Sequence, residues 1–460
     1  MCRIRGTKVR RDLFGLMVVL LAAWGAEGLL ARSAALAQAP APPQAAPDDS
    51  PIARPESSQT DPFGEDAPDE NAPKAKDNEI TPPPMAPEIG LPAIKEEGTY
   101  ACRSPKHRRE LLKQFGGTRA TERAAAAALY WLAKHQMPDG SWSLEKFQKM
   151  CTDKSCTGVG SIESLSAATG LGLLPFLAAG QTQATNGPFQ RKVAAGVYWL
   201  LNHQKRDGDL SADAASQMYS HAIATIALCE DYGMTKDKPV GVAAQMAVNF
   251  IVAAQNQKTG GWRYHPGEEG DTSVLGWQMQ ALHAAQEAGL TVKPAALDGA
   301  KNFLASCQPA EHVGWFCYQP EAGATPPMTA VGLLASQDLK MDRTDPVILG
   351  GSALLLANQP QAENRNIYYW YYATQALHNL AGKESEFTSN KNWDTWNRKI
   401  RKLLVETQAR EGCAAGSWDP DKPNKDAWGP YGGRIMQTSL SCLTLEIYYR
   451  HLPAALPEKP

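Results

Sequence analysis

A glutamine that recurs at a nearly fixed spacing constrains the fold of this chain more than any other feature. The steps between successive copies are 68, 51, 53, 51 and 49 residues, for Gln136, Gln204, Gln255, Gln308, Gln359 and Gln408. The extra length of the first step falls in residues 151–160, which have the composition of an inserted loop. A period of this size is typical of stacked supersecondary units. We therefore expect a repeat architecture from about residue 118 onward.

Each repeat contains two helical patterns of different character. Before Gln255, apolar residues recur at helical spacing with polar residues between them, which is typical of an outer helix with one buried face. Segments 273–285 and 435–445 are apolar or small almost all round, as expected of an inner helix that is covered on both sides. The pattern predicts an all-α fold in which six helix pairs close into an (α/α)6 toroid. Closure removes the exposed terminal faces of an open helical solenoid, which is the alternative architecture.

A turn of the form Gln-x(n)-Gly-x-Trp follows the outer helix in several repeats. Glycine permits the tight turn, and the glutamine amide can bond free backbone groups at helix ends. Tryptophan adds a large buried surface between units. The tryptophans of these turns are Trp142, Trp262, Trp315 and Trp418, whereas the second copy is degenerate and the fifth keeps only its glutamine. We interpret these anchors as structural, and the histidines that precede two of the glutamines, His135 and His203, are not counted as ligands.

This turn resembles the repeat of the squalene/oxidosqualene cyclase and protein prenyltransferase β-subunit superfamily, over residues from about 120 to 452. The resemblance implies a terpenoid cyclase-like toroid. It also implies that the catalytic Asp-x-Asp-Asp-Thr-Ala stretch of the cyclases corresponds to residues 268–273, where Gly270 occupies the place of the usual proton donor. The Asp-x-Cys pair with which prenyltransferases bind zinc has no counterpart in this sequence.

The N-terminal part of the chain indicates export. A basic start, an apolar run over 16–23 and small residues at Ala35 and Ala37 predict an export signal over residues 1–37, and its Arg10-Arg11 pair resembles a twin-arginine signal. Residues 38–98 are rich in proline, alanine and acidic residues, which predicts a disordered linker. The toroid is then expected over residues 99–455, in a periplasmic or extracellular protein whose linker would allow association with the envelope.

Charge and cysteine content narrow the classes of partner. A net charge of -2, from 46 basic and 48 acidic residues, gives no electrostatic footprint for nucleic acid. In an oxidising compartment, Cys151 with Cys156 and Cys307 with Cys317 are candidate disulfides, whereas Cys229 is expected to be a buried free thiol. No C-x-x-C pair is present, so neither a metal site nor a cofactor is expected.

Asp271 and His221 are the candidate catalytic residues. His221 lies 17 residues after Gln204 and Asp271 lies 16 after Gln255, so neighbouring repeats should place them at the same level. An aspartate beside a histidine can be held in a defined protonation state and act as acid or base. The structural alternatives are a helix N-cap for Asp271 and a satisfied core residue for His221.

Aromatic residues are the candidate ligand-binding groups. The helix that opens at 367 places three tyrosines on one face, and residues of two neighbouring repeats can extend the same wall; the set is Tyr219, Tyr264, Trp277, Tyr368, Tyr371 and Tyr372. Facing a cavity, these rings could stabilise a carbocation or stack on a sugar or an apolar ring. Facing the outer ring, they are core.

The sequence therefore predicts an exported toroid that binds an apolar, isoprenoid-like ligand or a protein partner without the catalytic chemistry of the superfamily. A first alternative is a terpenoid cyclase or isomerase that uses Asp271 as proton donor, with Asp271 and His221 in hydrogen-bonding reach. A second is a polysaccharide-active toroid, which needs two carboxylates facing each other across a groove. The acidic residues available for that role are Glu268, Glu269, Asp271 and Asp419.

Overall fold

The computed structural model describes residues 99–211, 216–382 and 390–451. All of them belong to Thr81–Pro460, the second of the two units into which the chain divides. The export signal predicted over 1–37, the linker predicted over 38–98 and the last residues of the predicted toroid, 452–455, lie outside the described residues. Among the helices that are described, none has the length and apolar character needed to cross a membrane.

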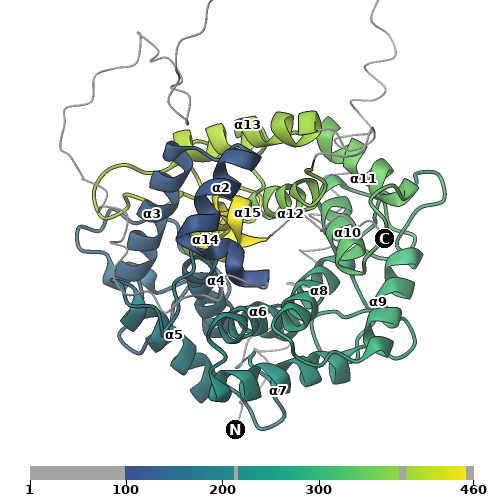
Figure 1. Cartoon of the computed structure of the whole chain (residues 1–460), viewed down its shortest axis with the longest axis horizontal. Coiled ribbons are helices and arrows are strands. Elements are labelled where there is room, and N and C mark those ends of the chain that lie inside the picture. Colours follow the sequence, from purple (N-terminus) through teal and green to yellow (C-terminus); the bar gives the residue numbers. More distant parts are fainter. Residues whose placement is uncertain (1–98, 212–215, 383–389, 452–460) are drawn as a thin grey trace, which may run out of the picture. The chain divides into compact units, whose positions relative to one another are not determined.

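Most helices form pairs of one outer and one inner helix. The outer helices are α3 (Arg119–Lys134), α5 (Gln190–His203), α7 (Lys238–Ala254), α9 (Pro294–Ser306), α11 (Pro346–Ala357) and α13 (Asn390–Thr407). The inner helices are α4 (Leu165–Ala178), α6 (Gln217–Thr235), α8 (Thr272–Glu287), α10 (Pro326–Asp338), α12 (Ile367–His378) and α14 (Gly429–Leu445). Short 3-10 turns cover Phe147–Met150 and Ala362–Asn364. Figure 1 shows the outer helices surrounding the inner ones, so the expected all-helical toroid is confirmed.

The ring is closed, which excludes the open solenoid. Each inner helix packs against the next from α4 to α14, and α14 packs in turn against α3 and α4 of the first pair. The inner helices are buried almost all round; every residue of α12, for example, is buried. This explains why their sequences lack a polar stripe.

The repeated glutamines join neighbouring repeats through their side-chain amides. The Nε2 of Gln255 donates to the carbonyl of Gly260 in its own turn at 2.8 Å and to that of Ala296 in the next outer helix, α9, at 2.9 Å. Gln136 and Gln204 make the same pair of bonds. Gln408 donates to Gly416 and, across the closure of the ring, to Ala124 of α3.

A glycine with positive φ sets which residue of each turn is buried. The residue two places after that glycine is buried in five turns, as Trp142, Leu210, Trp262, Phe316 and Trp418. The expected anchor of the fourth turn, Trp315, is wrong by one position. Trp315 directly follows Gly314, is partly exposed and stacks on His312, whereas Phe316 is fully buried.

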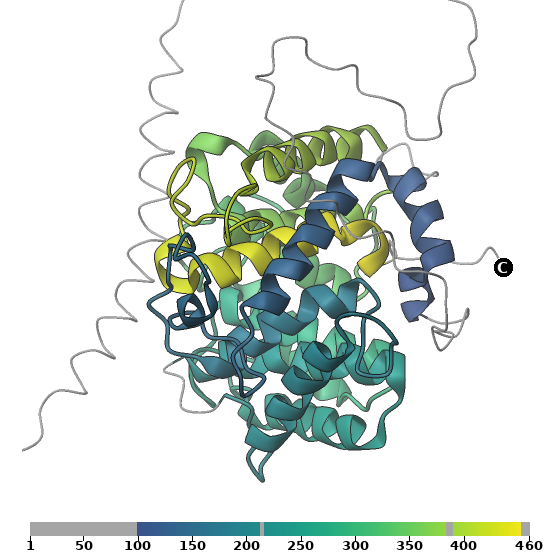
Figure 2. The same cartoon turned by 90° about the vertical axis from the view of Figure 1, so that its left-hand side faces the viewer.

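The N- and C-terminal helices of the described residues fill the centre at one end of the ring. The 3-10 turn η2 (Thr99–Arg103), α2 (Pro105–Phe115) and α15 (Ile447–Arg450) pack together, and Figures 1 and 2 show α2 beside the C-terminal helices. Arg103 and Arg450 both pair with Glu230 of α6, at 2.8 and 3.1 Å, and all three side chains are buried. We call this group the central ion cluster.

The cysteines do not form the expected disulfides. All eight cysteines of the described residues are free thiols, including the proposed pairs Cys151–Cys156 and Cys307–Cys317. In the second pair the two residues are joined by a backbone hydrogen bond of 2.8 Å, from the Cys317 amide to the Cys307 carbonyl. Cys229 is a buried free thiol, as expected.

Candidate functional site

Asp271 is the N-cap of the inner helix α8. Its Oδ1 accepts a hydrogen bond from the Val274 amide at 2.9 Å. Other inner helices begin in the same way with uncharged caps, because Ser164, Thr325 and Asn366 each accept from the amide three residues on. The capping explanation of Asp271 therefore describes its position, but capping needs only one side-chain oxygen.

The second carboxylate oxygen of Asp271 is not used by the cap. Oδ1 also accepts from the Ser273 hydroxyl, whereas Oδ2 is buried and has no hydrogen-bond partner. The nearest charged atom is Nε of Arg263, which lies 3.9 Å away and is itself buried without a partner. Burial raises the pKa of Asp271 to about 6, although hydrogen bonds from Ser273 and Val274, the Arg263 charge and the nearby Tyr318 hydroxyl act in the opposite direction.

Phenol groups surround this carboxylate. The hydroxyls of Tyr264 and Tyr318 are 2.6 Å apart, and the Tyr219 hydroxyl lies 2.5 Å from that of Ser273. Burial raises the pKa of Tyr264 to about 12, so its phenol is a neutral donor at ordinary pH. The site therefore contains several hydroxyl groups around one carboxylate and one guanidinium.

The site has one open edge. Tyr219 is partly exposed and the Arg263 side chain is 28% exposed, while Asp271 beneath them is fully buried. The ring of Tyr264 joins the two edge residues, because it lies 6.1 Å from the Tyr219 ring and 5.4 Å below the Arg263 guanidinium. We call this edge the Tyr219–Arg263 mouth.

His221 does not join this site. Its Nδ1 accepts from the Leu210 amide at 3.0 Å, and its Nε2 donates to the Ala247 carbonyl at 3.0 Å. The Asp209 carboxylate is farther from Nδ1, at 3.7 Å, than the Leu210 amide is, so both ring nitrogens have a backbone partner. Within the described residues no hydrogen bond connects His221 with Asp271.

The same bond pattern identifies what His221 does in the repeat. The amide of Trp142 donates to the Thr169 hydroxyl and that of Phe316 to the Thr329 hydroxyl, in the first and fourth repeats. His221 accepts from Leu210, which occupies the corresponding turn position in the second repeat. It therefore takes the place of an inner-helix threonine.

The remaining aromatic candidates pack against one another in the centre. The Trp277 ring stacks on Tyr371 at 5.8 Å and meets the edge of Tyr372 at 5.6 Å, and Tyr368 lies 4.9 Å from Tyr372. None of these four side chains is more than 6% exposed. A cavity wide enough for an isoprenoid would leave its lining accessible to water, so these rings are core in this structure.

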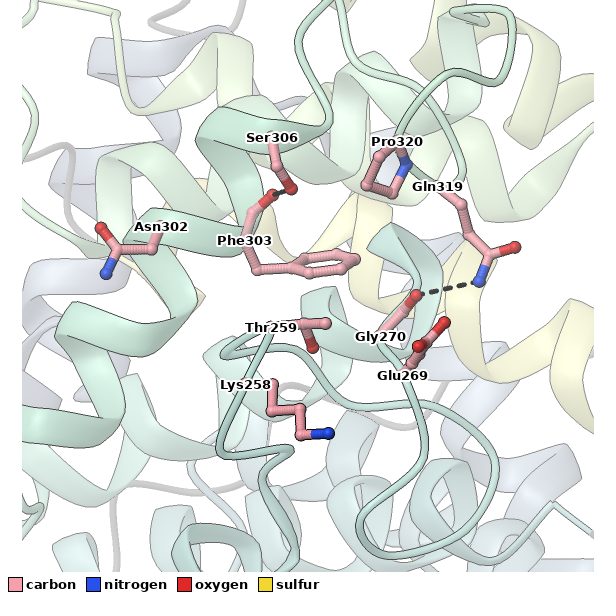
Figure 3. A pocket seen from close by; sticks show the side chains of 9 residues that line it. All are labelled: Lys258, Thr259, Glu269, Gly270, Asn302, Phe303, Ser306, Gln319 and Pro320. Atoms are coloured by element: carbon pink, nitrogen blue, oxygen red, sulfur yellow. Dashed lines mark hydrogen bonds between the residues drawn. The ribbon is translucent and has the colours of Figure 1, made fainter.

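A shallow depression of about 400 Å³ lies outside the Asp271 turn. Lys258 and Thr259 line one side of it, and Figure 3 shows the Phe303 ring between them and Gln319, which donates to the Gly270 carbonyl at 3.1 Å. Asp271 is not among its lining residues. Its rim combines a lysine with Glu269, and the depression is open to solvent.

The carboxylates considered for sugar cleavage are in different surroundings. Glu268 and Glu269 are exposed in a loop, whereas Asp271 is buried at the cap. Asp419 pairs with Arg434 at 2.6 Å.

Tyr318 and Arg263 belong to the site but were not predicted. Arg263 follows the turn residue Trp262, and its charge beside an aspartate-capped helix is a signal that could have suggested a pairing. Tyr318 comes from the turn of the following repeat, 47 residues after Asp271, and nothing in its local pattern places its hydroxyl at the cap.

Comparison with protein-family models gives no match, and comparison with curated proteins also gives none. Among solved structures, an inactive variant of the α-1,6-mannanase GH76A of Salegentibacter sp. matches at 10% identity and a TM-score of 0.49, covering 72% of this chain and 99% of that one. Cellobiose 2-epimerase from Spirochaeta thermophila matches at 14% identity and 0.49, covering 76% and 97%. The type II terpene cyclase MstE from Scytonema matches at 12% identity and 0.46, covering 72% and 97%. Likeness at this level does not bear on function.

Proposed function

We propose that this toroid is a binding protein that holds a polar group of its ligand between Asp271 and Arg263 and leaves that ligand chemically unchanged. The observation that supports this is the pair of unpartnered buried atoms, Asp271 Oδ2 and Arg263 Nε, 3.9 Å apart. Buried polar atoms in folded proteins are nearly always hydrogen-bonded. A ligand hydroxyl satisfies both atoms, because it donates to the carboxylate and accepts from the guanidinium.

The body of the ligand would lie over the Tyr219–Arg263 mouth. The Tyr219 and Tyr264 rings offer a surface for an apolar chain or a ring. We favour an isoprenoid-like molecule with a hydroxyl or carbonyl end, because the one charged pair is surrounded by aromatic groups. A saccharide offers the same hydroxyl chemistry, and the experiment below separates these two sources.

Two observations favour binding over catalysis. A general acid must exchange its proton with a partner, but His221, the expected partner of Asp271, bonds elsewhere. In addition, the position of the usual proton donor of the cyclases is occupied by Gly270, which has no side chain.

The test is extraction of the purified full chain with organic solvent and, separately, with hot water, followed by mass spectrometry. We expect a prenyl-type molecule with a polar end in the organic extract of the wild type, and its loss from Asp271→Asn and from Arg263→Gln. Asparagine caps helices as well as aspartate does, so Asp271→Asn changes the charge while leaving the cap in place.

Asp345→Asn is the matched control, because Asp345 caps the outer helix α11 through the Val347 amide at 2.8 Å and lies away from the mouth. It should retain the ligand. A saccharide in the aqueous extract would replace the isoprenoid assignment. A molecule that the wild type alters and Asp271→Asn does not would establish an enzyme, and no ligand in either extract would favour a protein partner.

A further inference from the structure

Four metal-binding side chains converge at a place that the proposed function does not use. The ligand atoms of His135, Cys151, Cys156 and Cys413 all lie within 4.8 Å of one another. His135 and Cys156 are buried, while Cys151 and Cys413 are partly exposed. We call this group the Cys3His cluster.

The imidazole of His135 is oriented for coordination. Its Nδ1 lies 2.8 Å from the Trp131 carbonyl, so this nitrogen bears the proton and Nε2 has a free lone pair. Nε2 faces two sulfurs, Cys156 Sγ at 3.3 Å and Cys413 Sγ at 3.6 Å. The ring also stacks on Trp131 at 4.2 Å, which fixes its plane. A histidine that donates its second ring nitrogen to a backbone carbonyl is the usual arrangement at a metal.

The spacing of the ligand atoms suits a tetrahedral zinc ion. With zinc–sulfur and zinc–nitrogen bonds of about 2.3 and 2.1 Å, neighbouring ligand atoms are separated by about 3.6 to 3.8 Å. The two nitrogen–sulfur distances of 3.3 and 3.6 Å are close to this separation. A Cys3His set is a common ligand set of structural zinc sites, and four protein ligands leave no position open for a substrate.

The loops around the cluster are held in place by their own hydrogen bonds. The Cys156 amide donates to the Cys151 sulfur at 3.4 Å, and the Cys151 thiol donates to an Asp153 carboxylate oxygen at 3.4 Å. Asp153 accepts from the Cys413 amide at 2.6 Å and from the Ser155 amide at 2.9 Å. The hydrogen bond between Asp153 and Cys413 therefore joins two turns that are 260 residues apart in sequence, without the help of an ion.

The cluster lies where the ring closes. His135 follows α3 and the two nearby cysteines belong to the loop after it, in the first repeat, whereas Cys413 belongs to the turn after α13, in the last. Helices α3 and α13 pack against each other. Any ion bound by these four residues would join the first repeat to the last.

We propose that His135, Cys151, Cys156 and Cys413 bind one zinc ion that fastens the first repeat of the toroid to the last. Binding requires three thiols to lose their protons to solvent and uses a neutral imidazole, which gives a site of net charge -1 with Zn²⁺. The inserted loop at 151–160, which lengthens only the first repeat, then supplies two of the four ligands at the place where the ring closes.

A disulfide is the competing chemistry for these cysteines, and thiol counting separates it from zinc. The full chain has nine cysteines. With zinc, denatured protein in the presence of chelator should show every thiol of the purified chain as reactive, and native protein should show the three ligands protected. A disulfide would leave two fewer reactive thiols under denaturing conditions without reductant.

The test is metal analysis of the full chain purified without chelator or added metal, by plasma mass spectrometry and native mass spectrometry. We expect about one zinc per chain in the wild type and less than about a tenth of that in Cys413→Ser, since loss of one ligand from a structural site greatly weakens binding. Cys413 is partly exposed, so the substitution should leave the fold intact.

Cys307→Ser is the control, because Cys307 is a cysteine beside a repeat turn that is not part of the cluster. It should retain the zinc. Cobalt loading of the metal-free protein gives a second readout, since thiolate-to-cobalt charge-transfer bands should appear in the wild type and weaken in Cys413→Ser. No metal, a metal other than zinc, a disulfide, or equal zinc in Cys413→Ser and wild type would each overturn the proposal.

Discussion

At the scale of single residues, Asp271 differs in its charge from the residues that cap three other inner helices through their side chains. Serine, threonine and asparagine perform the same capping at α4, α10 and α12 without a second oxygen that needs a partner. A buried carboxylate costs stability when it ionises, and Arg263 at 3.9 Å does not fully offset this cost. A residue that is unfavourable for the fold at one repeat is a good candidate for a role in binding.

The pH dependence of stability tests the surroundings of Asp271. Because its pKa is raised by burial to about 6 in the folded protein, the folded state binds the proton more tightly than the unfolded state does. Stability should therefore fall as pH rises from about 4 to about 6. Asp271→Asn removes this loss and should be more stable than wild type at pH 7.5 by up to about 3 kcal/mol, with a smaller difference at pH 4.5.

Urea unfolding at the two pH values measures both differences, and Asp345→Asn is the control. If Asp271→Asn and Asp345→Asn followed the wild type equally at both pH values, Asp271 would not be an ionising buried group. A loss of stability in Asp271→Asn at pH 7.5 would instead show that Arg263 stabilises the charged carboxylate.

At the scale of elements, the turn of a repeat connects the outer helix both to the next outer helix and to the core. The glutamine amide joins its own turn to the next outer helix, and a positive-φ glycine fixes which following residue enters the core. Gln308 makes neither of the bonds that Gln255 makes, although the two belong to neighbouring repeats. Neighbouring repeats are therefore not all joined by the same glutamine hydrogen bonds.

Replacing the glutamine by methionine, which has similar volume but no donor, tests this difference. Gln255→Met leaves the Gly260 and Ala296 carbonyls without their partner and should lower the free energy of unfolding by about 2–4 kcal/mol. Gln308→Met should change it by less than about 0.5 kcal/mol. Equal losses in urea unfolding would contradict the bridging role of the amide.

The fourth turn tests the rule that the residue two places after the positive-φ glycine is the buried one. Phe316→Ala removes a fully buried ring and should cost about 3–5 kcal/mol. Trp315→Ala removes a partly exposed ring that stacks mainly on His312, and should cost less than about 1 kcal/mol. The larger residue is thus expected to matter less, and thermal unfolding of the two variants would show the reverse order if Trp315 were the anchor.

The sequence predicted the elements better than the site, for a physical reason. Periodicity and the recurring glutamine are local or evenly spaced signals, so the all-helical toroid could be predicted from them. The Arg263–Asp271 pair and the Cys3His cluster depend on how turns from different repeats meet, which spacing does not encode. Cys413 is 257 residues after Cys156, and its place beside the first repeat follows only from ring closure.

At the scale of the whole molecule, two sets of contacts hold the ring together: those where the ring closes and those of the central ion cluster. The closure joins α14 and α13 to the first repeat, and Gln408 bonds Ala124 across it. The central ion cluster ties the segments before and after the ring to α6. Without these contacts, the apolar faces of the inner helices at that end of the ring would be exposed to water, which is unfavourable.

The central ion cluster provides the test at this scale. Arg103 and Arg450 lower the pKa of the Glu230 carboxyl against the effect of burial, so the stabilisation exists above its unfolded pKa and is lost as pH falls through the lower folded value. Glu230→Gln leaves two buried guanidinium groups without a counter-charge and should cost about 3–5 kcal/mol at pH 7.5. The loss should shrink in acid, where the wild-type carboxyl is itself protonated.

Glu122→Gln is the control, because its pair with Arg108 is about a quarter exposed and should contribute less than about 1 kcal/mol. Equal losses in urea unfolding at pH 7.5 would mean that the cluster does not hold the centre of the ring closed.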